Sequence, residues 1–337
     1  MKNFLVLFLI GTLSVFAFQN CGGGFFSDMR AVTNNNFIKL DTSTGIKNIP
    51  PSFAFFADAM DGVGSGNHIS ETSPHANIHF VISNSPQNFI EKLKQIKTIN
   101  SKSFLMLQGY IFEWKSVKIN ADADSRLKEL KSTLAAEDLL DVVVGIYLID
   151  EPYWVDSLQS QPLGFKQVYD NLKIAAELVQ KHFGKEVLLL SSEAYPVLDT
   201  HIANGNWPGF PEQFDLLAVN CYLAFGVACD GQSKYKKYID ALESALKINQ
   251  RQFLTLDNFW NNESQITTTL QNKLIERTKY QVNLAKEKKI PLLVSFLYQS
   301  QPSNIDNLVG LDQMPLLFDY VASVSSSFRG VTHSSPQ

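Results

Sequence analysis

Eight short apolar runs, separated by longer amphipathic segments, are the feature of this 337-residue chain that most limits its fold. The runs are apolar along their whole length instead of alternating with polar residues. This pattern is typical of strands buried on both faces, as in a parallel sheet. The runs cover residues 52–58, 77–83, 103–109, 142–150, 186–192, 214–220, 252–258 and 291–298.

Most of the intervening segments carry helix signals. In SPQNFIEKLKQI, Ser85 is a capping residue and Pro86 suits the first helical position. The first and fifth crossovers, residues 64–75 and 197–213, are weaker as helices. We therefore predict an α/β fold with a single (β/α)₈ TIM barrel over residues 51–330. An open doubly wound sheet is the alternative, but no glycine-rich phosphate turn follows the first run.

The N-terminus, MKNFLVLFLIGTLSVFAFQNC, has one lysine followed by an apolar stretch and a cysteine. It resembles a bacterial lipoprotein signal, which implies cleavage before Cys21 and a lipid on its thiol. We expect a signal peptide at 1–20 and a tether with an N-terminal extension at 21–50. The location would be the cell envelope, lipid-anchored at the outer membrane or the periplasmic face. The alternative is an ordinary secretory signal and a secreted protein.

Composition narrows the choice of partners. The chain is 45% hydrophobic and 18% charged, as globular proteins are, and its net charge of −4 argues against a nucleic-acid partner. We expect a monomer whose membrane contact is the lipid on Cys21. Cys221 and Cys229 are close in sequence, and an exported protein would use them as a disulfide. Two free buried thiols are the alternative.

Aromatic and polar side chains follow the predicted strands. In a barrel these positions meet at the C-terminal face, where barrel enzymes carry their active sites. Aromatic rings there would suit stacking against sugars, although they would also serve as a roof for the core. The candidate substrate-binding residues are Asp58, Trp114, Trp154, Asn220, Tyr222, Trp260 and Tyr298.

The fourth run ends in IDEPYW, which places Asp150 and Glu151 side by side before a proline. The motif resembles the fourth-strand signature of (β/α)₈ glycoside hydrolases. In many retaining members it reads Asn-Glu-Pro, and the glutamate is the general acid/base. In hexosaminidases that act on acetamido sugars, an Asp-Glu pair stands there and the aspartate orients the substrate's N-acetyl group.

The same three residues also favour a helix N-terminus. We predict that the next helix begins near Leu163, so capping explains the motif less well than catalysis. Glu151 is the expected acid, because burial and the neighbouring Asp150 would raise its pKa.

The second catalytic group has two candidates, Asp257 at the end of the seventh run and Glu193 after the fifth. In the Asn-Glu-Pro enzymes the nucleophile is a glutamate at the seventh strand, so Asp257 would be one methylene shorter. If Asp150 has the hexosaminidase role, no protein nucleophile is needed and Tyr222 would help hold the acetamido group. Retaining and substrate-assisted mechanisms both stay open.

The aspartate at position 150 suggests a poly- or oligosaccharide with amino or acetamido sugars, because a carboxylate accepts hydrogen bonds from an N–H group. We expect no metal, since the six histidines lack ligand spacing, and no cofactor, since no dinucleotide fingerprint occurs. A serine nucleophile is not expected either, because the chain has no G-x-S-x-G elbow. The alternative from another class is a surface lipoprotein that binds polysaccharide without cleaving it.

Overall fold

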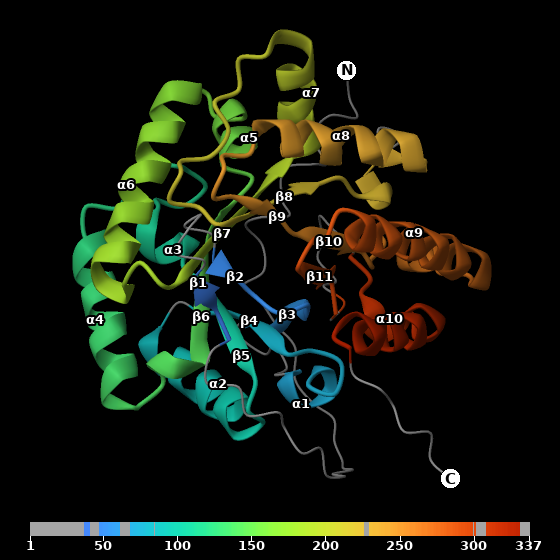
Figure 1. The fold of residues 1–337 in the computed structure, drawn as a ribbon, viewed down its shortest axis with the longest axis horizontal. Helices are drawn as coiled ribbons and strands as arrows, with labels where there is room; N and C mark the ends of the chain where they lie inside the picture. The colour runs from blue at the N-terminus through green and yellow to red at the C-terminus, as the bar shows by residue number, and fades with distance from the viewer. Residues whose placement is uncertain are drawn as a thin grey trace.

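A nearly closed cylinder of parallel strands confirms the predicted single (β/α)₈ barrel (Figure 1). The computed structural model describes residues 37–40, 47–60, 68–83, 85–225, 229–298, 300 and 308–330. The strand order is β10-β11-β3-β4-β5-β6-β7-β8-β9. The strands are β3 (Ser52–Met60), β4 (Ile78–Ile82), β5 (Lys102–Met106), β6 (Val143–Asp150), β7 (Leu188–Ala194), β8 (Leu216–Asn220), β9 (Arg251–Gln252), β10 (Leu254–Asp257) and β11 (Leu292–Phe296).

The barrel nearly closes through one predicted strand that the structure divides in two. The run at 252–258 contributes β9, which pairs with β8, and β10, which pairs with β11. Phe253 lies between the two halves, and its backbone N–H donates to the carbonyl of Leu217 at 2.9 Å. The two ends of the nine-stranded order are therefore consecutive in the chain. This is the arrangement of a barrel and excludes the open doubly wound sheet.

Helices surround the sheet, as Figure 1 shows. Ser85 caps α2 as predicted, because its hydroxyl accepts a hydrogen bond from the Asn88 N–H at 3.3 Å. The weak fifth crossover does form a helix, because Val197 and Leu198 are buried against the core and Pro196 suits the first turn. The longer helices are α2 (Pro86–Thr98), α4 (Ala123–Ala136), α6 (Phe165–Phe183), α7 (Tyr195–Asn204), α8 (Gln232–Ala245), α9 (Thr268–Glu287) and α10 (Pro315–Phe328), and the short ones are α1 (Ile69–Thr72), α3 (Gln108–Ile111) and α5 (Pro152–Ser157).

The interior of the barrel is filled by large side chains, and this requires one glycine. Phe80, Phe104 and Leu190 are fully buried in the cluster inside the sheet. A Cβ at Gly145 would lie 2.5 Å from the Phe104 ring, so the backbone of β6 approaches that ring as no other residue could. The interior of the barrel is thus a packed core. A ligand could bind only near the C-terminal ends of the strands.

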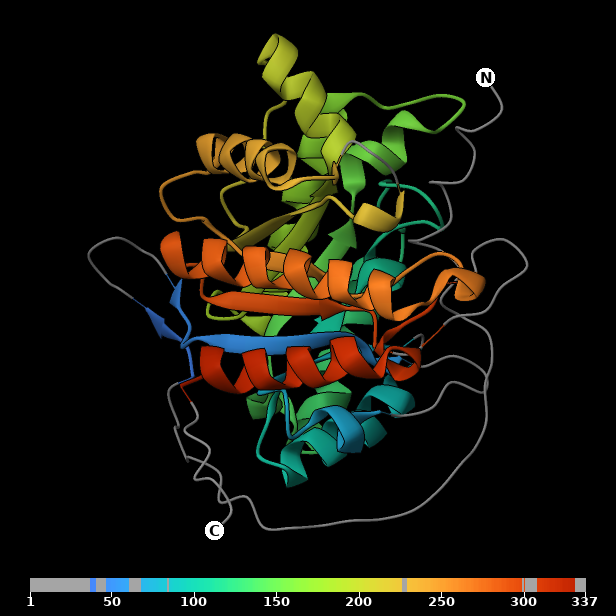
Figure 2. The ribbon, with the colours of Figure 1, turned by 90° about the vertical axis from the view of Figure 1, so that its right-hand side faces the viewer.

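A two-stranded hairpin, β1 (Lys39–Leu40) and β2 (Lys47–Asn48), lies at the end where the barrel strands begin (Figure 2). Lys47 Nζ contacts Asp215 Oδ2 and the Val187 carbonyl, each at 2.9 Å. Part of the predicted N-terminal extension therefore packs on the barrel. The predicted signal peptide and Cys21 lie outside the described residues. In the part of the chain that is described, no helix is long and apolar enough to cross a bilayer.

Cys221 and Cys229 form the predicted disulfide, with Cα atoms 5.4 Å apart. We expect the double variant Cys221→Ala/Cys229→Ala to lose roughly 2.5 kcal/mol of unfolding free energy, because the bond closes a short loop in the unfolded chain. Urea denaturation of the variant and of the oxidised wild type measures the difference. Equal midpoints and slopes would show that the bond does not contribute to stability.

Candidate active site

The chain turns sharply where β6 ends. Glu151 has φ 50° and ψ 49°, a left-handed conformation that costs a residue with a side chain about 1 kcal/mol or more. Its backbone N–H donates to the Ser192 carbonyl at 2.9 Å, which ties the turn to the neighbouring strand β7. Such strain persists only where the surroundings enforce it and is found most often at functional sites.

Three donors converge on one oxygen of Asp150. Its Oδ1 accepts hydrogen bonds from the Tyr147 hydroxyl at 2.7 Å, the Ser192 hydroxyl at 2.6 Å and the Asn220 amide at 3.0 Å. The two hydroxyls also lie 2.6 Å from each other. These donors come from β6, β7 and β8, so the closed sheet itself assembles the cluster. They stabilise the ionised form of Asp150.

Asn220 connects the two acidic residues. Its Nδ2 donates to Asp150 Oδ1 at 3.0 Å and to Glu151 Oε1 at 2.9 Å, so both amide hydrogens are used. The Tyr222 hydroxyl donates to Asn220 Oδ1 at 3.0 Å and thereby fixes which end of the amide faces the carboxylates. Asn220 and Tyr222, both predicted for the site, therefore belong to one network with Asp150 and Glu151.

The electrostatic environment separates the two carboxyl groups. Burial, and then the charge of Asp150, raise the pKa of Glu151 well above its ordinary value, and Glu193 adds to this while the Asn220 amide opposes it. Burial also raises the pKa of Asp150, but its Ser192, Tyr147 and Asn220 donors oppose that effect. The pKa of Glu151 is consequently raised more strongly than that of Asp150, so Glu151 is the member of the pair that holds a proton more readily. A carboxyl pair pushed apart in this way is the pattern of an acid and its charged partner.

The pair faces a small cavity near the C-terminal ends of the barrel strands. Both polar groups and aromatic rings line it. Tyr222 stacks on Phe296 with centroids 5.5 Å apart, and Phe296 in turn lies 4.8 Å from Phe56. The residues that line the cavity are Phe56, Phe80, Tyr147, Asp150, Glu151, Asn220, Tyr222, Phe253, Thr255, Val294 and Phe296.

Glu193 has a different position from the pair. It is fully buried, and its carboxylate accepts hydrogen bonds from the backbone N–H groups of Tyr153 (3.0 Å), Trp154 (3.2 Å) and Ala194 (2.9 Å). Two of these donors belong to the first turn of α5, so Glu193 caps that helix from another strand. Burial raises the pKa of Glu193 to about 8, and the three N–H donors oppose the effect.

The prediction that the next helix begins near Leu163 was wrong, because α5 begins at Pro152. Glu151 occupies the N-cap position of α5, but its side chain makes no capping hydrogen bond. The proline was the signal for this helix. The capping explanation of the Asp-Glu-Pro motif thus applies to the backbone, while the Glu151 side chain is left to face Asn220 and the cavity.

Asp257 does not line the cavity. It is fully buried, its Oδ2 accepts from the Leu223 N–H at 2.5 Å, and Arg277 Nε lies 3.7 Å from the same oxygen. Burial raises the pKa of Asp257 to about 6, although Arg277 opposes this. The structure therefore brings Asp150, Glu151, Asn220 and Tyr222 together and places Asp257 and Glu193 behind them.

Apart from Tyr222, the predicted aromatic residues are not among those that line the described cavity. Trp114 is 67% exposed on the loop after α3, and the Trp260 indole donates to Gln265 at 2.7 Å. Tyr298 packs edge-on against Phe55 with centroids 5.8 Å apart, and Trp154 packs on the outer core. The Asp58 side chain lies outside the described residues.

Sequence reasoning missed Tyr147, Ser192 and Phe296. Tyr147 and Ser192 contact Asp150, and Phe296 stacks on Tyr222. Each lies in the C-terminal half of a strand and points into the barrel. Successive strand residues point alternately inward and outward, but a continuous apolar run does not show which of them point inward. Within the described ranges, no group of three or more His, Cys, Asp and Glu side chains could hold a metal ion.

No protein-family model and no curated protein sequence matches this chain. Among solved structures, the β-glucuronidase of Ruminococcus gnavus is similar, with a TM-score of 0.55, 9% identity, and coverage of 84% of this chain and 52% of that chain. The chain thus spans about half the length of that neighbour. Virulence factor SghA from Agrobacterium tumefaciens is similar with a TM-score of 0.51 and 8% identity over 78% of this chain and 87% of that one. This chain shares with a glycosidase the fold of a nearly closed parallel barrel.

Proposed function

We propose that this protein is a glycoside hydrolase in which Glu151 is the general acid/base and Asp150 its charged partner. The observation that carries the proposal is the Asp150–Glu151 pair on the cavity, bridged by the Asn220 amide at 3.0 and 2.9 Å. Its position at the end of the fourth barrel strand is where this fold carries catalytic groups. The fold shared with a glycosidase supports the same reaction class.

Glu151 would protonate the glycosidic oxygen as the bond to the leaving group breaks. This step needs an acid that keeps its proton near neutrality, and the raised pKa of Glu151 meets that need. After the leaving group departs, the ionised Glu151 would take a proton from the attacking water. The same side chain would therefore act as acid and then as base.

The second catalytic group is the point at which the two mechanisms differ. Among the described residues, the carboxyl groups that line the cavity are those of Asp150 and Glu151. Asp257 and Glu193 accept backbone hydrogen bonds elsewhere. This arrangement favours the substrate-assisted mechanism, which needs no protein nucleophile.

In that mechanism the carbonyl oxygen of the substrate's 2-acetamido group bonds to C1 as the C1–O bond to the leaving group breaks. Asp150 would accept the acetamido N–H. All three of its protein donors contact Oδ1, and no described residue donates to Oδ2, so this second oxygen is available. Water would then open the ring formed on C1 and give up a proton to Glu151. The proposed substrate is a poly- or oligosaccharide that contains 2-acetamido sugars.

The β-glucuronidase neighbour is described in complex with D-glucuronic acid. No lysine, arginine or histidine is found among the described residues that line the cavity. A uronic acid would therefore bring its carboxylate towards Asp150 with no cation to pair with it, which is unfavourable.

The test is digestion of matched oligomers of glucose, N-acetylglucosamine and N-acetylgalactosamine, followed by mass spectrometry of the products. We expect cleavage of an acetamido-sugar oligomer. Faster cleavage of plain glucose oligomers would contradict the substrate class. Binding of the oligomers with no cleavage of any would instead support the polysaccharide-binding lipoprotein.

The pH dependence follows from the raised pKa of Glu151. The acid must be protonated, so kcat/KM should fall as the pH rises through the pKa of Glu151. Because that pKa is raised, the fall should come well above the range of an ordinary glutamate. A pH–rate profile on a cleaved oligomer checks this. An alkaline limb near pH 4.5, the ordinary value for glutamate, would contradict the assignment.

We further propose that the mature protein is a monomeric lipoprotein, anchored in the cell envelope through Cys21. Expression in a Gram-negative host with an alkyne-labelled fatty acid should label the wild type, whereas Cys21→Ala should take up no label and leave the membrane fraction. Equal labelling of both would exclude Cys21 as the lipid site.

A further inference from the structure

The segment that follows β8 holds two residues of the proposed site and alternates between two environments. Asn220 and Tyr222 line the cavity. Their neighbours Cys221 and Leu223 are buried in the outer core, together with Cys229. Whatever holds Cys221 and Leu223 therefore sets the position of Tyr222 between them.

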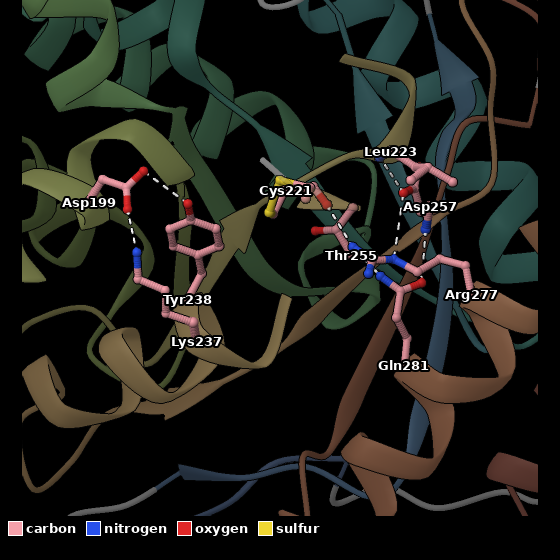
Figure 3. Close-up of a disulfide and its surroundings, with 10 residues drawn as sticks. Asp199, Cys221, Leu223, Lys237, Tyr238, Thr255, Asp257, Arg277 and Gln281 are labelled. Atoms are coloured by element: carbon pink, nitrogen blue, oxygen red, sulfur yellow. Dashed lines mark hydrogen bonds and ion pairs between the residues drawn. A yellow bond between two sulfur atoms is a disulfide. The ribbon is translucent and has the colours of Figure 1, made fainter. Parts of the chain in front are cut away.

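Three contacts hold this segment from behind, and Figure 3 shows the residues involved. The Leu223 N–H donates to Asp257 Oδ2 at 2.5 Å, and Arg277 Nη2 donates to the Cys221 carbonyl at 3.2 Å. The disulfide to Cys229 is the third contact. The contacts come from β10, α9 and the loop itself, and they act on the residues on either side of Tyr222.

Arg277 is itself held in place. Its guanidinium carbon lies 4.0 Å from the centre of the Tyr235 ring, and its Nε lies 3.7 Å from Asp257 Oδ2. The residue is 8% exposed and Asp257 is fully buried. Asp257 and Arg277 thus form a buried pair that also contacts the main chain on either side of Tyr222.

A continuous path leads from this pair to the two carboxyl groups. Asp257 and Arg277 fix the main chain at 221 and 223, and the Tyr222 hydroxyl donates to Asn220 Oδ1 at 3.0 Å. Asn220 then donates to Asp150 and Glu151. We propose that Asp257 and Arg277 are positioning residues for the Asn220–Tyr222 unit, and that Asp257 is not the catalytic nucleophile. The positioning role stands without the proposed function, and only its expected effect on turnover rests on that function.

The first experiment needs no turnover. Carboxyl ¹³C NMR, with the Glu151 signal assigned by its loss in Glu151→Gln, follows the titration of Glu151 in Asp257→Ala and Tyr222→Phe. Asn220 lowers the pKa of Glu151, so loosening Asn220 should raise it, by about one unit in each variant. The double variant should shift no further than the larger single variant, because both act on one path. A shift in Tyr222→Phe without one in Asp257→Ala would overturn the proposal.

Two further variants give matched comparisons. Asp257→Asn keeps an acceptor for the Leu223 N–H and loses the charge opposite Arg277, so its shift should be smaller than that of Asp257→Ala. If Asp257→Ala does not fold, Asp257→Asn and Arg277→Lys replace it. An unchanged pKa of Glu151 in both of these variants would then overturn the proposal. Asp230→Ala removes an exposed acid of the same loop, 3.8 Å from Lys273, and should leave the pKa of Glu151 unchanged.

The second experiment separates positioning from nucleophilic catalysis. On 4-nitrophenyl 2-acetamido-2-deoxy-β-D-glucopyranoside, Asp257→Asn should lower kcat roughly tenfold and move the alkaline limb of the pH profile upwards. Restoration of Asp257→Ala by azide, with release of a glycosyl azide, would identify Asp257 as the nucleophile and overturn the proposal. If the wild type cleaves no glycoside, the proposed function fails, and the NMR titration still decides the positioning role.

Discussion

Glu151→Gln should lower kcat by about 10²–10⁴-fold, the usual contribution of a general acid. Glutamine keeps the size of the side chain and can still accept the Asn220 hydrogen bond, but its amide is not acidic and cannot protonate the glycosidic oxygen. Affinity for the oligosaccharide should change little, since the cavity walls stay in place. Steady-state kinetics and calorimetric titration measure the two quantities separately.

The loss should not come from unfolding. Burial and Asp150 both disfavour the ionised form of Glu151, so a neutral glutamine should leave the melting temperature unchanged or raise it. Glu113→Gln is the matched control, because Glu113 is an exposed acid on a segment that follows another barrel strand. Full activity in Glu151→Gln would exclude Glu151 as the acid. Equal losses in both variants would point to a general effect of charge.

Glu193→Ala should cost roughly 3–9 kcal/mol of unfolding free energy. It leaves the N–H groups of Tyr153, Trp154 and Ala194 without their acceptor. Each buried donor left unpaired costs about 1–3 kcal/mol. The loss should be concentrated in α5, whose first turn contains Tyr153 and Trp154. Urea denaturation measures the total, and hydrogen exchange at Tyr153 and Trp154 locates it. Unchanged protection at those amides would show that Glu193 does not hold the helix.

The pH dependence of the conservative variant Glu193→Gln provides the control. The pKa of Glu193 is raised from 4.5 to about 8 in the folded protein, so its favourable contribution is complete below pH 4.5 and is lost as the pH rises towards 8. Glutamine does not titrate. The stability of Glu193→Gln relative to the wild type should therefore rise between about pH 5 and 8. A constant difference across this range would contradict the raised pKa.

The strands and the barrel could be predicted because their signals are local. A continuous apolar run indicates a strand buried on both faces, and eight such runs separated by amphipathic segments leave few ways to bury them all. The split of the seventh run into β9 and β10 was not predicted, because it depends on how the sheet closes around Phe253. The helix α5 was missed for a different reason. Pro152 was a local signal for this helix, but its capping acceptor is Glu193, about 40 residues away, which no local pattern reveals.

The residues of the site divide in the same way. Sequence alone identified the Asp150–Glu151 pair and the barrel end on which it lies, because all strands of the barrel run in one direction and the residues that follow them share one face. It also identified Cys221 and Cys229 as a pair, because they are close in the chain. It could not decide which polar groups at that face meet. Asn220 bridges the pair, whereas Asp257 contacts Leu223 and Arg277. Those contacts join residues far apart in the chain, and only the closure and packing of the folded barrel bring them within hydrogen-bonding distance.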